Sequence, residues 1–514
     1  MATVADRYRA PQALCRAGLL AFALALSPDV PAADGWVFTP SVSLRGTATD
    51  NVDLSDTDKH GDFITEVIPA ITVDGQGARV KLHLDYRMDN LIYARDSSKN
   101  NLQNTLNAIG SVEAIENFFY IDGVASIAQD AVSPFGPRPT DATTFTDNRT
   151  ETRTYRLSPY IRGRLASSAD YLLRYSYTDL RSSSDATGDS RVGALTAQLG
   201  DTTSSSTLGW RIDANSQTVD SDQRRDTRAD RARGSLVVAI DPQFRLTGTA
   251  GYERNDYQTF GMSGQTTFGG GFEWAPSARS NVHGNWERRF FGSGWDFGAR
   301  NRTPFLAFSI TATRDVQTDA QNAAGINSGA AYDLLFAALT TRFPDALDRA
   351  AEAQRILQGG DIPPNLGLPP DFLVGGVYVE RRQQASAAFL GVRNTLTFIV
   401  YQVNRQPLGV GESSATTPGF ASSTREKGAS ATFSHRLSGF SSVTAITSWR
   451  RTTGESSTSE LSSRQWDARL LYVTQFGRRT SGSLEYRHAR FNSDAGGSSD
   501  YRENALIGSL LYQF

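Results

Sequence analysis

Cysteine is almost absent from this chain of 514 residues, which carries one, Cys15, near its amino end. A single thiol excludes an internal disulfide framework and a cysteine-based metal cluster. Histidine is scarce too, and the five histidines show neither an HExxH pattern nor another paired ligand spacing. No GxSxG segment for a hydrolase nucleophile occurs. We therefore expect no enzyme activity, no bound metal and no cofactor.

The sequence also lacks long apolar runs and a large net charge. After Leu26, no apolar stretch approaches the roughly 18 residues that a membrane-spanning helix needs. The formal net charge is −2, which gives no reason to expect a nucleic-acid partner. A membrane barrel stays compatible with this composition, because its strands turn only half of their residues toward lipid.

The first 33 residues have the composition of a secretory signal peptide. Three arginines precede the apolar stretch 17–26, and small residues at positions 30 and 32 follow it. Residues 1–33 are therefore expected to be removed after export, and Cys15 with them. The remaining residues, 34–514, are expected to form one barrel.

Residues 79–89 alternate strictly between apolar and polar side chains. One set comprises Val80, Leu82, Leu84, Tyr86 and Met88; the other comprises Arg79, Lys81, His83, Asp85, Arg87 and Asp89. Only a β-strand sends alternate side chains to opposite faces. The charged face must meet water and the apolar face lipid, as in a transmembrane barrel. The same alternation recurs at 155–165, 171–178, 245–253, 466–472 and 484–487, and in the last strand before Phe514.

The connections between these strands alternate in length. Short turns are predicted at 74–78, 166–169, 241–243, 275–279, 391–394, 437–440 and 477–480. Longer polar loops are predicted at 50–61, 96–103, 129–152, 181–190, 220–231, 255–263, 316–377, 407–424, 454–463 and 492–500. The pattern predicts an all-β, antiparallel, up-and-down barrel of about 22 strands (range 16–22), with both ends on the periplasmic side. It is weakest near 291–304.

One loop differs from the others in composition. Within 316–377, the segment 330–357 has helical composition and spacing, with a start at Pro344-Asp345 and a stop at Gly359-Gly360. We expect a long helical insert at the outer end of the barrel. A loop of this length is usually functional or disordered. A lid or constriction is therefore one interpretation, and a surface appendage is the other.

Three amino-terminal segments carry a family resemblance. Residues 36–54, 65–88 and 105–128 resemble the outer-membrane barrel proteins associated with the PEP-CTERM/exosortase system. The insert ending AEAQRIL, the segment 386–398 and the terminal LLYQF are similar too. The resemblance implies an outer-membrane role linked to exopolysaccharide production or export, as a passive conduit or accessory. It supplies no catalytic residues.

Cationic side chains on the predicted lumen face are the best functional candidates. The predicted path comprises Arg79, Lys81, His83, Arg87, Arg156, Arg162, Arg164, Arg174, Arg245, Arg469 and Arg487. Arginine binds carboxylates and phosphates in bidentate fashion, so this set could pass an acidic polymer or other anions. The alternative is that the arginines only pair with lumen carboxylates. Those carboxylates are Asp85, Asp89, Glu253, Asp467 and Glu485.

Two other interpretations remain beside a polymer conduit. One is a general or anion-selective diffusion porin, and another is a structural or adhesive barrel. A plugged receptor fits poorly, since the first strand begins almost at the predicted cleavage site. The Asp-rich loop at 50–62 suits calcium by composition, but it lacks the glutamate of an EF-hand loop, and we favour a solvated loop.

Location and partners follow from these expectations. In the bacterial outer membrane the chain would meet membrane lipid and lipopolysaccharide. Phe514, an aromatic carboxy-terminus, is expected to be an assembly signal for the barrel-assembly machinery. Exopolysaccharide and periplasmic export components are the further partners that the resemblance implies.

Overall fold

The computed structural model describes most of the chain: residues 35–138, 141–144, 146–165, 169–184, 188–201, 207–222, 224–319, 377–408, 423–455, 460–494 and 500–514. The predicted signal peptide and nearly all of the predicted helical insert lie outside these residues. Within them, no helix is long and apolar enough to cross a bilayer.

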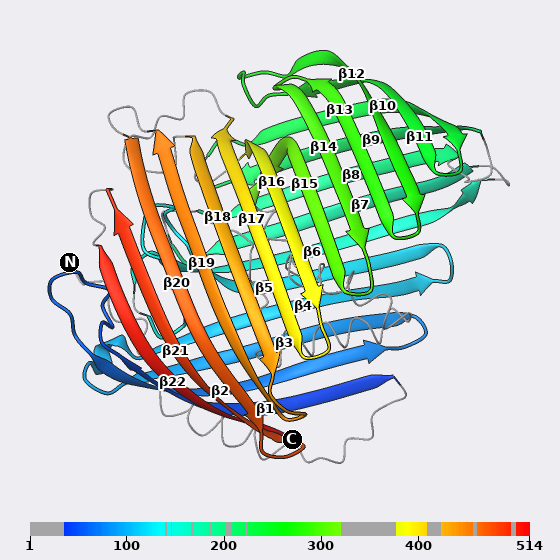
Figure 1. Cartoon of the computed structure of the whole chain (residues 1–514). Coiled ribbons are helices and arrows are strands. Elements are labelled where there is room, and N and C mark those ends of the chain that lie inside the picture. The colour runs from blue at the N-terminus through cyan, green and yellow to red at the C-terminus, as the bar shows by residue number, and fades with distance from the viewer. Residues whose placement is uncertain are drawn as a thin grey trace.

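Twenty-two antiparallel strands form one closed sheet (Figure 1). Each strand pairs with the next along the chain, and β22 pairs with β1. The predicted barrel class and strand number are confirmed, and so is a strand in the weakly patterned region near 291–304. The strands are β1 (Trp36–Thr49), β2 (Asp62–Gln76), β3 (Val80–Tyr93), β4 (Asn101–Ile115), β5 (Phe119–Ala131), β6 (Arg149–Leu165), β7 (Ala169–Ser182), β8 (Ser190–Asp201), β9 (Leu208–Ser221), β10 (Thr227–Asp241), β11 (Phe244–Asn255), β12 (Ser263–Ser277), β13 (Ser280–Arg289), β14 (Gly292–Arg302), β15 (Leu306–Thr318), β16 (Val377–Leu390), β17 (Asn394–Pro407), β18 (Thr424–Arg436), β19 (Ser441–Glu455), β20 (Glu460–Gln475), β21 (Thr480–Ser493) and β22 (Tyr501–Gln513); a short 3-10 helix, η2 (Ser97–Lys99), lies between β3 and β4.

The last strand closes the barrel. β22 pairs with β1 over nine residue pairs. Beyond them, the backbone N–H of Phe514 donates to the carbonyl of Pro40 at 3.0 Å. The Phe514 ring meets that of Tyr512 edge-on, with 5.1 Å between centroids. A closed sheet leaves no unpaired edge, which a barrel in lipid requires because lipid offers no hydrogen-bond partners.

The two ends of the barrel differ in the length of their connections. At the end that holds Trp36 and Phe514, the turns are short, such as 242–243 and 278–279. We call this the short-turn end. The opposite, long-loop end carries longer connections, such as 50–61, although the turn between β13 and β14 is short. In outer-membrane barrels, long loops face outward and short turns face the periplasm.

Side chains alternate between an apolar outer face and a polar inner face. On β6, the outward Tyr155 and Leu157 are 42% and 55% exposed, whereas Thr154 and Ser158, on either side of them in the sequence, are each 2% exposed. The backbone can therefore hold an apolar surface toward lipid while polar groups meet each other inside. The predicted two-faced pattern holds on this strand.

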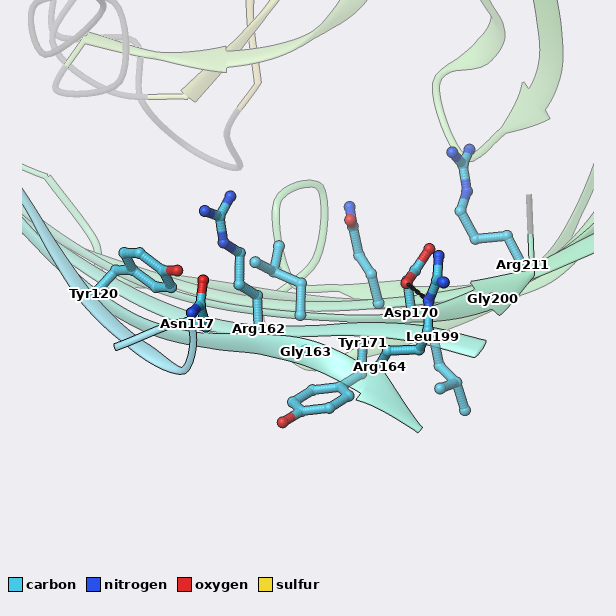
Figure 2. Close-up of a pocket in the computed structure, with 12 residues that line it drawn as sticks. Asn117, Tyr120, Arg162, Gly163, Arg164, Asp170, Tyr171, Leu199, Gly200 and Arg211 are labelled. Carbon is cyan, nitrogen blue, oxygen red and sulfur yellow. Dashed lines mark hydrogen bonds and ion pairs between the residues drawn. The ribbon is translucent and has the colours of Figure 1, made fainter. Parts of the chain in front are cut away.

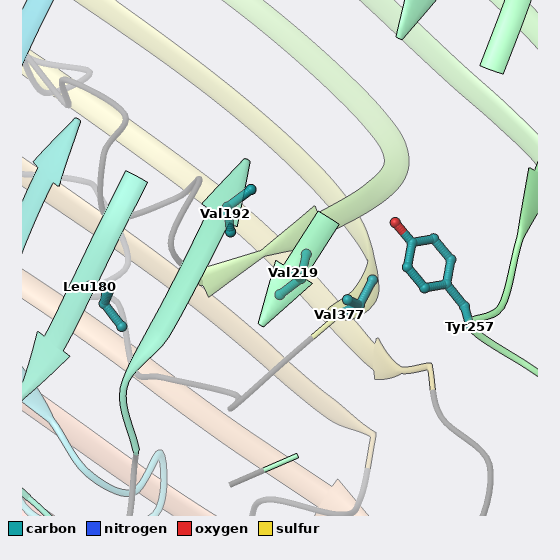
Figure 3. Close-up of a cluster of buried hydrophobic side chains, with 5 residues drawn as sticks. All are labelled: Leu180, Val192, Val219, Tyr257 and Val377. Carbon is teal, nitrogen blue, oxygen red and sulfur yellow. The ribbon is translucent and has the colours of Figure 1, made fainter. Parts of the chain in front are cut away.

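An apolar cluster lies at the long-loop end. Figure 3 shows Leu180, Val192 and Val219, from β7, β8 and β9, near Tyr257 and Val377. Tyr257 belongs to the β11–β12 connection, and Val377 begins β16. Strands that are distant in the sheet thus share one buried cluster. Burial of each such side chain stabilises by about 1.5–3 kcal/mol.

Candidate pore site

The connection between β5 and β6 folds into the barrel. The Arg138 carbonyl accepts a hydrogen bond from Gln465 of β20 at 2.8 Å, and the Phe135 carbonyl accepts one from Ser493 of β21 at 3.1 Å. Both donors lie on the inner faces of strands that are far from β5 in the sheet. We call residues 132–148 the inner loop; 139–140 and 145 are not among its described residues. The sequence predicts an outer loop at 129–152, and the inward path corrects that expectation.

Asp141 of the inner loop is the centre of a buried charge network. Its carboxylate pairs with Arg45 of β1 and, at 2.8 Å, with Arg487 of β21. Arg487 is fully buried and also contacts Glu503 of β22 at 2.9 Å. Burial alone would raise the pKa of Asp141, but the neighbouring arginines outweigh it and hold this pKa well below its usual range. The docked carboxylate is therefore ionised.

Arg138 forms a second anchor on another part of the wall. Its guanidinium donates to Glu426 of β18 at 3.0 Å, and the two side chains are only 5% and 3% exposed. Glu426 also accepts from the Tyr401 hydroxyl of β17 at 2.9 Å. Burial lowers the pKa of Arg138, and the Glu426 charge opposes that effect. A buried pair of this kind is costly to break from one side, so it fixes the loop in place.

The two ends of the inner loop are joined by hydrogen bonds. The Asn148 side chain accepts from the Ser133 backbone N–H at 2.6 Å and donates to the Ser133 carbonyl at 3.0 Å. A Cβ at Gly136 would lie 2.5 Å from Asn148, and one at Gly454 would lie 2.4 Å from the Phe135 ring. Glycine is therefore needed at both points of close approach.

A stack of tyrosine rings and arginine guanidinium groups lines the wall near the short-turn end. The Tyr120 and Tyr160 rings stack with 5.1 Å between centroids. The Arg162 guanidinium lies 4.3 Å from the Tyr120 centroid, and that of Arg174 lies 4.0 Å from the Tyr160 centroid. Arg174 is neutralised by Asp122 at 2.9 Å. Cation–π contact orients Arg162 and leaves its charge in place.

The stack borders a hollow of about 560 Å³. Figure 2 shows Tyr120, Arg162 and Arg211 directed to the same side of the wall, and Tyr171 to the other. Neither Arg162 nor Arg156, which precedes it on the inner face of β6, forms an ion pair with a described residue. These two cations are the ones in the stack region that can take an external anion.

The other predicted path residues, apart from His83, fall into two groups. Paired with carboxylates are Arg79 (Glu116), Arg87 (Asp89), Arg164 (Asp170), Arg174 (Asp122), Arg469 (Glu485) and Arg487 (Glu503 and Asp141). Lys81 and Arg245 lie on inner faces and form no ion pair among the residues that the structure covers. Arg79 sits in the β2–β3 turn rather than within a strand. Most of the predicted arginines are thus paired with carboxylates, as the alternative interpretation predicts. Only a minority of the predicted set is left to bind an external anion.

His83 lies between two carboxylates on the lumen side. Its Nδ1 is 2.7 Å from Asp74 and its Nε2 is 2.8 Å from Asp85. Because both ring nitrogens have a carboxylate partner, neither is placed to take a proton from a nucleophile. The arrangement cross-links β2 and β3.

The Asp-rich loop at 50–62 is held by side chains of the protein. Lys99 pairs with Asp53, and His60 lies 3.6 Å from Asp53 and 3.5 Å from Asp58. Asp50 accepts from the Asn504 amide at 2.7 Å. No cluster of three or more metal-ligating side chains occurs in the described part of the chain. A solvated, internally bonded loop is the interpretation that these contacts favour.

Asp141→Asn is expected to loosen the inner loop. Of its two ion pairs with described carboxylates, Arg487 would keep the one with Glu503, and breaking a buried pair from one side costs about 3–5 kcal/mol. The loosening would be measured as faster proteolysis within 132–148 and a higher single-channel conductance. Asp179→Asn is the matched control, since its ion pair with the exposed Arg181 lies on the outer face and contributes about 1 kcal/mol or less.

Lowering the pH is not expected to have the effect of Asp141→Asn above about pH 4, because the Asp141 carboxylate stays ionised there. A carboxyl with a lowered folded-state pKa contributes stability that is fully present above its unfolded pKa, about 3.9. That stability is lost only as the pH falls through the folded value. Because the Asp141 pKa is lowered, conductance should stay constant from neutral pH down to about 4.5. A rise in this range that Asp141→Asn abolishes would contradict the role of Asp141.

Comparison with solved structures gives the class of the fold. The FrpB iron transporter from Neisseria meningitidis superposes with a TM-score of 0.51 at 9% identity, over 93% of this chain and 83% of that one. Its apoprotein form gives 0.50 at 10% identity, over 94% and 82%. OccK2 from Pseudomonas aeruginosa shows a looser likeness, with a TM-score of 0.37 at 10% identity over 94% and 100%. The chain is a large β-barrel of the outer-membrane type.

Sequence comparisons add no closer relative. No protein-family model and no curated protein sequence matches the chain. The structural likeness therefore shows the fold alone, and function has to be argued from the lumen.

Proposed function

We propose that this chain is an outer-membrane barrel that conducts anionic solutes, with an acidic exopolysaccharide as the candidate cargo. The observation that carries the anion part is the pair of lumen cations Arg156 and Arg162, which form no ion pair with any described residue. They lie beside a stack that fixes Arg162 over Tyr120. A guanidinium held in this way binds a carboxylate or phosphate in bidentate fashion. No catalytic step is part of the proposal.

The inner loop sets how wide the passage is. Barrels of 22 strands have a lumen wide enough to hold a plug in known transporters. Here the inner loop takes up part of that space and is anchored through Asp141 and Arg138 to distant parts of the wall. Selection would then combine size at the inner loop with charge at Arg156 and Arg162.

The link to exopolysaccharide is supported by the resemblance to exosortase-associated barrels. It implies periplasmic export components as partners and the barrel-assembly machinery as the route of insertion. Loss of secreted polymer in a deletion strain, restored by the intact gene, would support this role. Unchanged polymer with an intact ion current would instead favour a diffusion porin. Absence of any current would favour a structural or adhesive barrel.

Neutralising Arg156 and Arg162 is expected to lower the anion-to-cation permeability ratio about fifteenfold. A unit charge at about 10 Å changes the energy of an ion by about 0.4 kcal/mol in water; two charges are removed, and the anion and the cation shift in opposite directions, so the ratio changes by about 1.6 kcal/mol. Reversal potentials in a KCl gradient across a planar bilayer would measure this for Arg156→Gln/Arg162→Gln. The control is Arg153→Gln/Arg181→Gln, which removes the same charge from the outer face. Equal ratios in both double variants would overturn the anion path.

A further inference from the structure

A group of cations lies on the outer face of the last five strands, close to the long-loop end. They occupy outward positions, in alternation with buried inner-face residues. We call this set the outer basic patch. It comprises Arg425 and Lys427 of β18, Arg451 of β19, Arg464 of β20, Arg490 of β21 and Arg502 of β22.

Strand register places these like charges against one another. Lys427 is directly opposite Arg451, and Arg451 is directly opposite Arg464. Arg490 and Arg502 form a second such pair. Directly opposed side chains have Cβ atoms about 4.5–5.5 Å apart, and like charges at that distance repel. None of the six side chains forms an ion pair with a carboxylate that the structure describes.

Outward cations on β6, β7, β10 and β11 at the same end are neutralised. Arg153 pairs with Glu151 at 2.7 Å on β6, and Arg181 pairs with Asp179 at 2.9 Å on β7. Arg228 and Arg254, on β10 and β11, share Asp230. These four strands therefore balance their outward charge internally, whereas Arg314 and Arg381, directly opposed on β15 and β16, form no ion pair with a described carboxylate. The outer basic patch keeps an uncompensated positive charge on the outside.

The patch lies at the expected level of lipid headgroups. Along β22, Tyr512 and Arg502 are separated by about 34 Å of strand, or about 26 Å along the membrane normal at a tilt near 40°. That matches the roughly 25 Å apolar band of an outer-membrane barrel. Trp449 and Trp466, exposed and directly opposite each other, lie two residues from Arg451 and Arg464 on the same outer face, on the side toward the middle of the membrane. Tryptophan is enriched at the boundary between lipid tails and headgroups.

We propose that the outer basic patch binds the phosphates of lipid A, the phosphorylated glycolipid anchor of lipopolysaccharide, in the outer leaflet. Arginine and lysine in a row form charge-assisted hydrogen bonds with phosphate oxygens. A lipid with more than one phosphate neutralises several of the opposed charges at once. A solute inside the lumen cannot reach this outward surface. The proposal depends on the outer-membrane location proposed above.

The test uses the purified full-length barrel in detergent, with bis-phosphorylated lipid A and its dephosphorylated form as probes. The patch variant is Lys427→Gln/Arg451→Gln/Arg464→Gln/Arg490→Gln. The matched control is Arg153→Gln/Arg181→Gln/Arg228→Gln/Arg254→Gln, which removes the same charge from the paired side. Native mass spectrometry gives the affinities, and circular dichroism checks folding.

The patch variant is expected to lose at least about tenfold in affinity for the phosphorylated probe, and the control to stay within about twofold. If the quadruple variant does not fold, Arg451→Gln/Arg464→Gln against Arg153→Gln/Arg181→Gln repeats the comparison. Equal losses in patch and control, or equal affinity for the two probes, would overturn the proposal. Cell fractionation tests the membrane location separately, so a failure of that location is distinguishable from a failure of the patch.

Discussion

Replacing residues 134–147 with a short glycine-serine linker is expected to raise single-channel conductance at least about twofold. The inner loop occupies a lumen that, with 22 strands, is wider than that of the open porins of 16–18 strands. The barrel itself should persist, because its strands are paired by backbone hydrogen bonds all the way round. Planar-bilayer recordings would measure the change.

The effect can be separated from a general loosening of the barrel. Arg138→Met/Glu426→Met removes the second anchor as a whole and leaves no buried charge behind. Replacing both members with apolar side chains is often close to neutral for stability, so this double variant should raise conductance less than the linker does. If the linker variant conducts no better than the parent, the inner loop does not limit the passage.

Strand positions were predictable from the sequence because membrane strands obey a local rule. Residues 79–89 show it best: Val80 and Leu82 face outward, and Lys81 and His83 face inward, as the alternation predicts. Each strand needs only its own side chains for this pattern, since lipid lies on one side and water on the other. Long and short connections follow from the same trace.

The inner loop could not be predicted in this way. Its length and polarity are those of an outer loop, and the predicted range 129–152 contains it. What turns it inward are partners far away in the chain: Arg138 meets Glu426 across 288 residues, and Asp141 meets Arg487 across 346. The local alternation of side chains does not indicate which distant residues form such pairs. Phe135, an apolar ring in a mostly polar loop, is a local sign that this loop buries a side chain.

The same limit applies to the lumen arginines. Alternation places Arg156, Arg162 and Arg174 on the inner face, but only the register of β5 with β6 and of β6 with β7 shows which of them meets a carboxylate. Arg174 reaches Asp122, whereas Arg162 rests on Tyr120. The sequence predicts which arginines face the lumen, and the three-dimensional structure shows which of them are paired with a carboxylate. Their role in conduction stays a prediction.

Reversing the charge at position 162 should reverse its effect on selectivity. Cys15 is the sole cysteine and lies in the predicted signal peptide, so Arg162→Cys would place a single thiol in the exported barrel. A cationic thiol reagent should restore the anion preference that this variant loses, and an anionic reagent should lower it further. The two products differ by two unit charges, each worth about 0.4 kcal/mol at about 10 Å, and anion and cation shift in opposite directions, so the permeability ratios should differ about fifteenfold.

Tyr175→Cys supplies the control for this reversal, because Tyr175 is on the outer face of the neighbouring β7 and is 48% exposed. Its modification should leave the permeability ratio unchanged with either reagent. A steric effect alone would lower the current equally with both reagents at position 162. Charge at Arg162 selects anions only if the two reagents move the reversal potential in opposite directions, since size is similar and sign is the variable that differs.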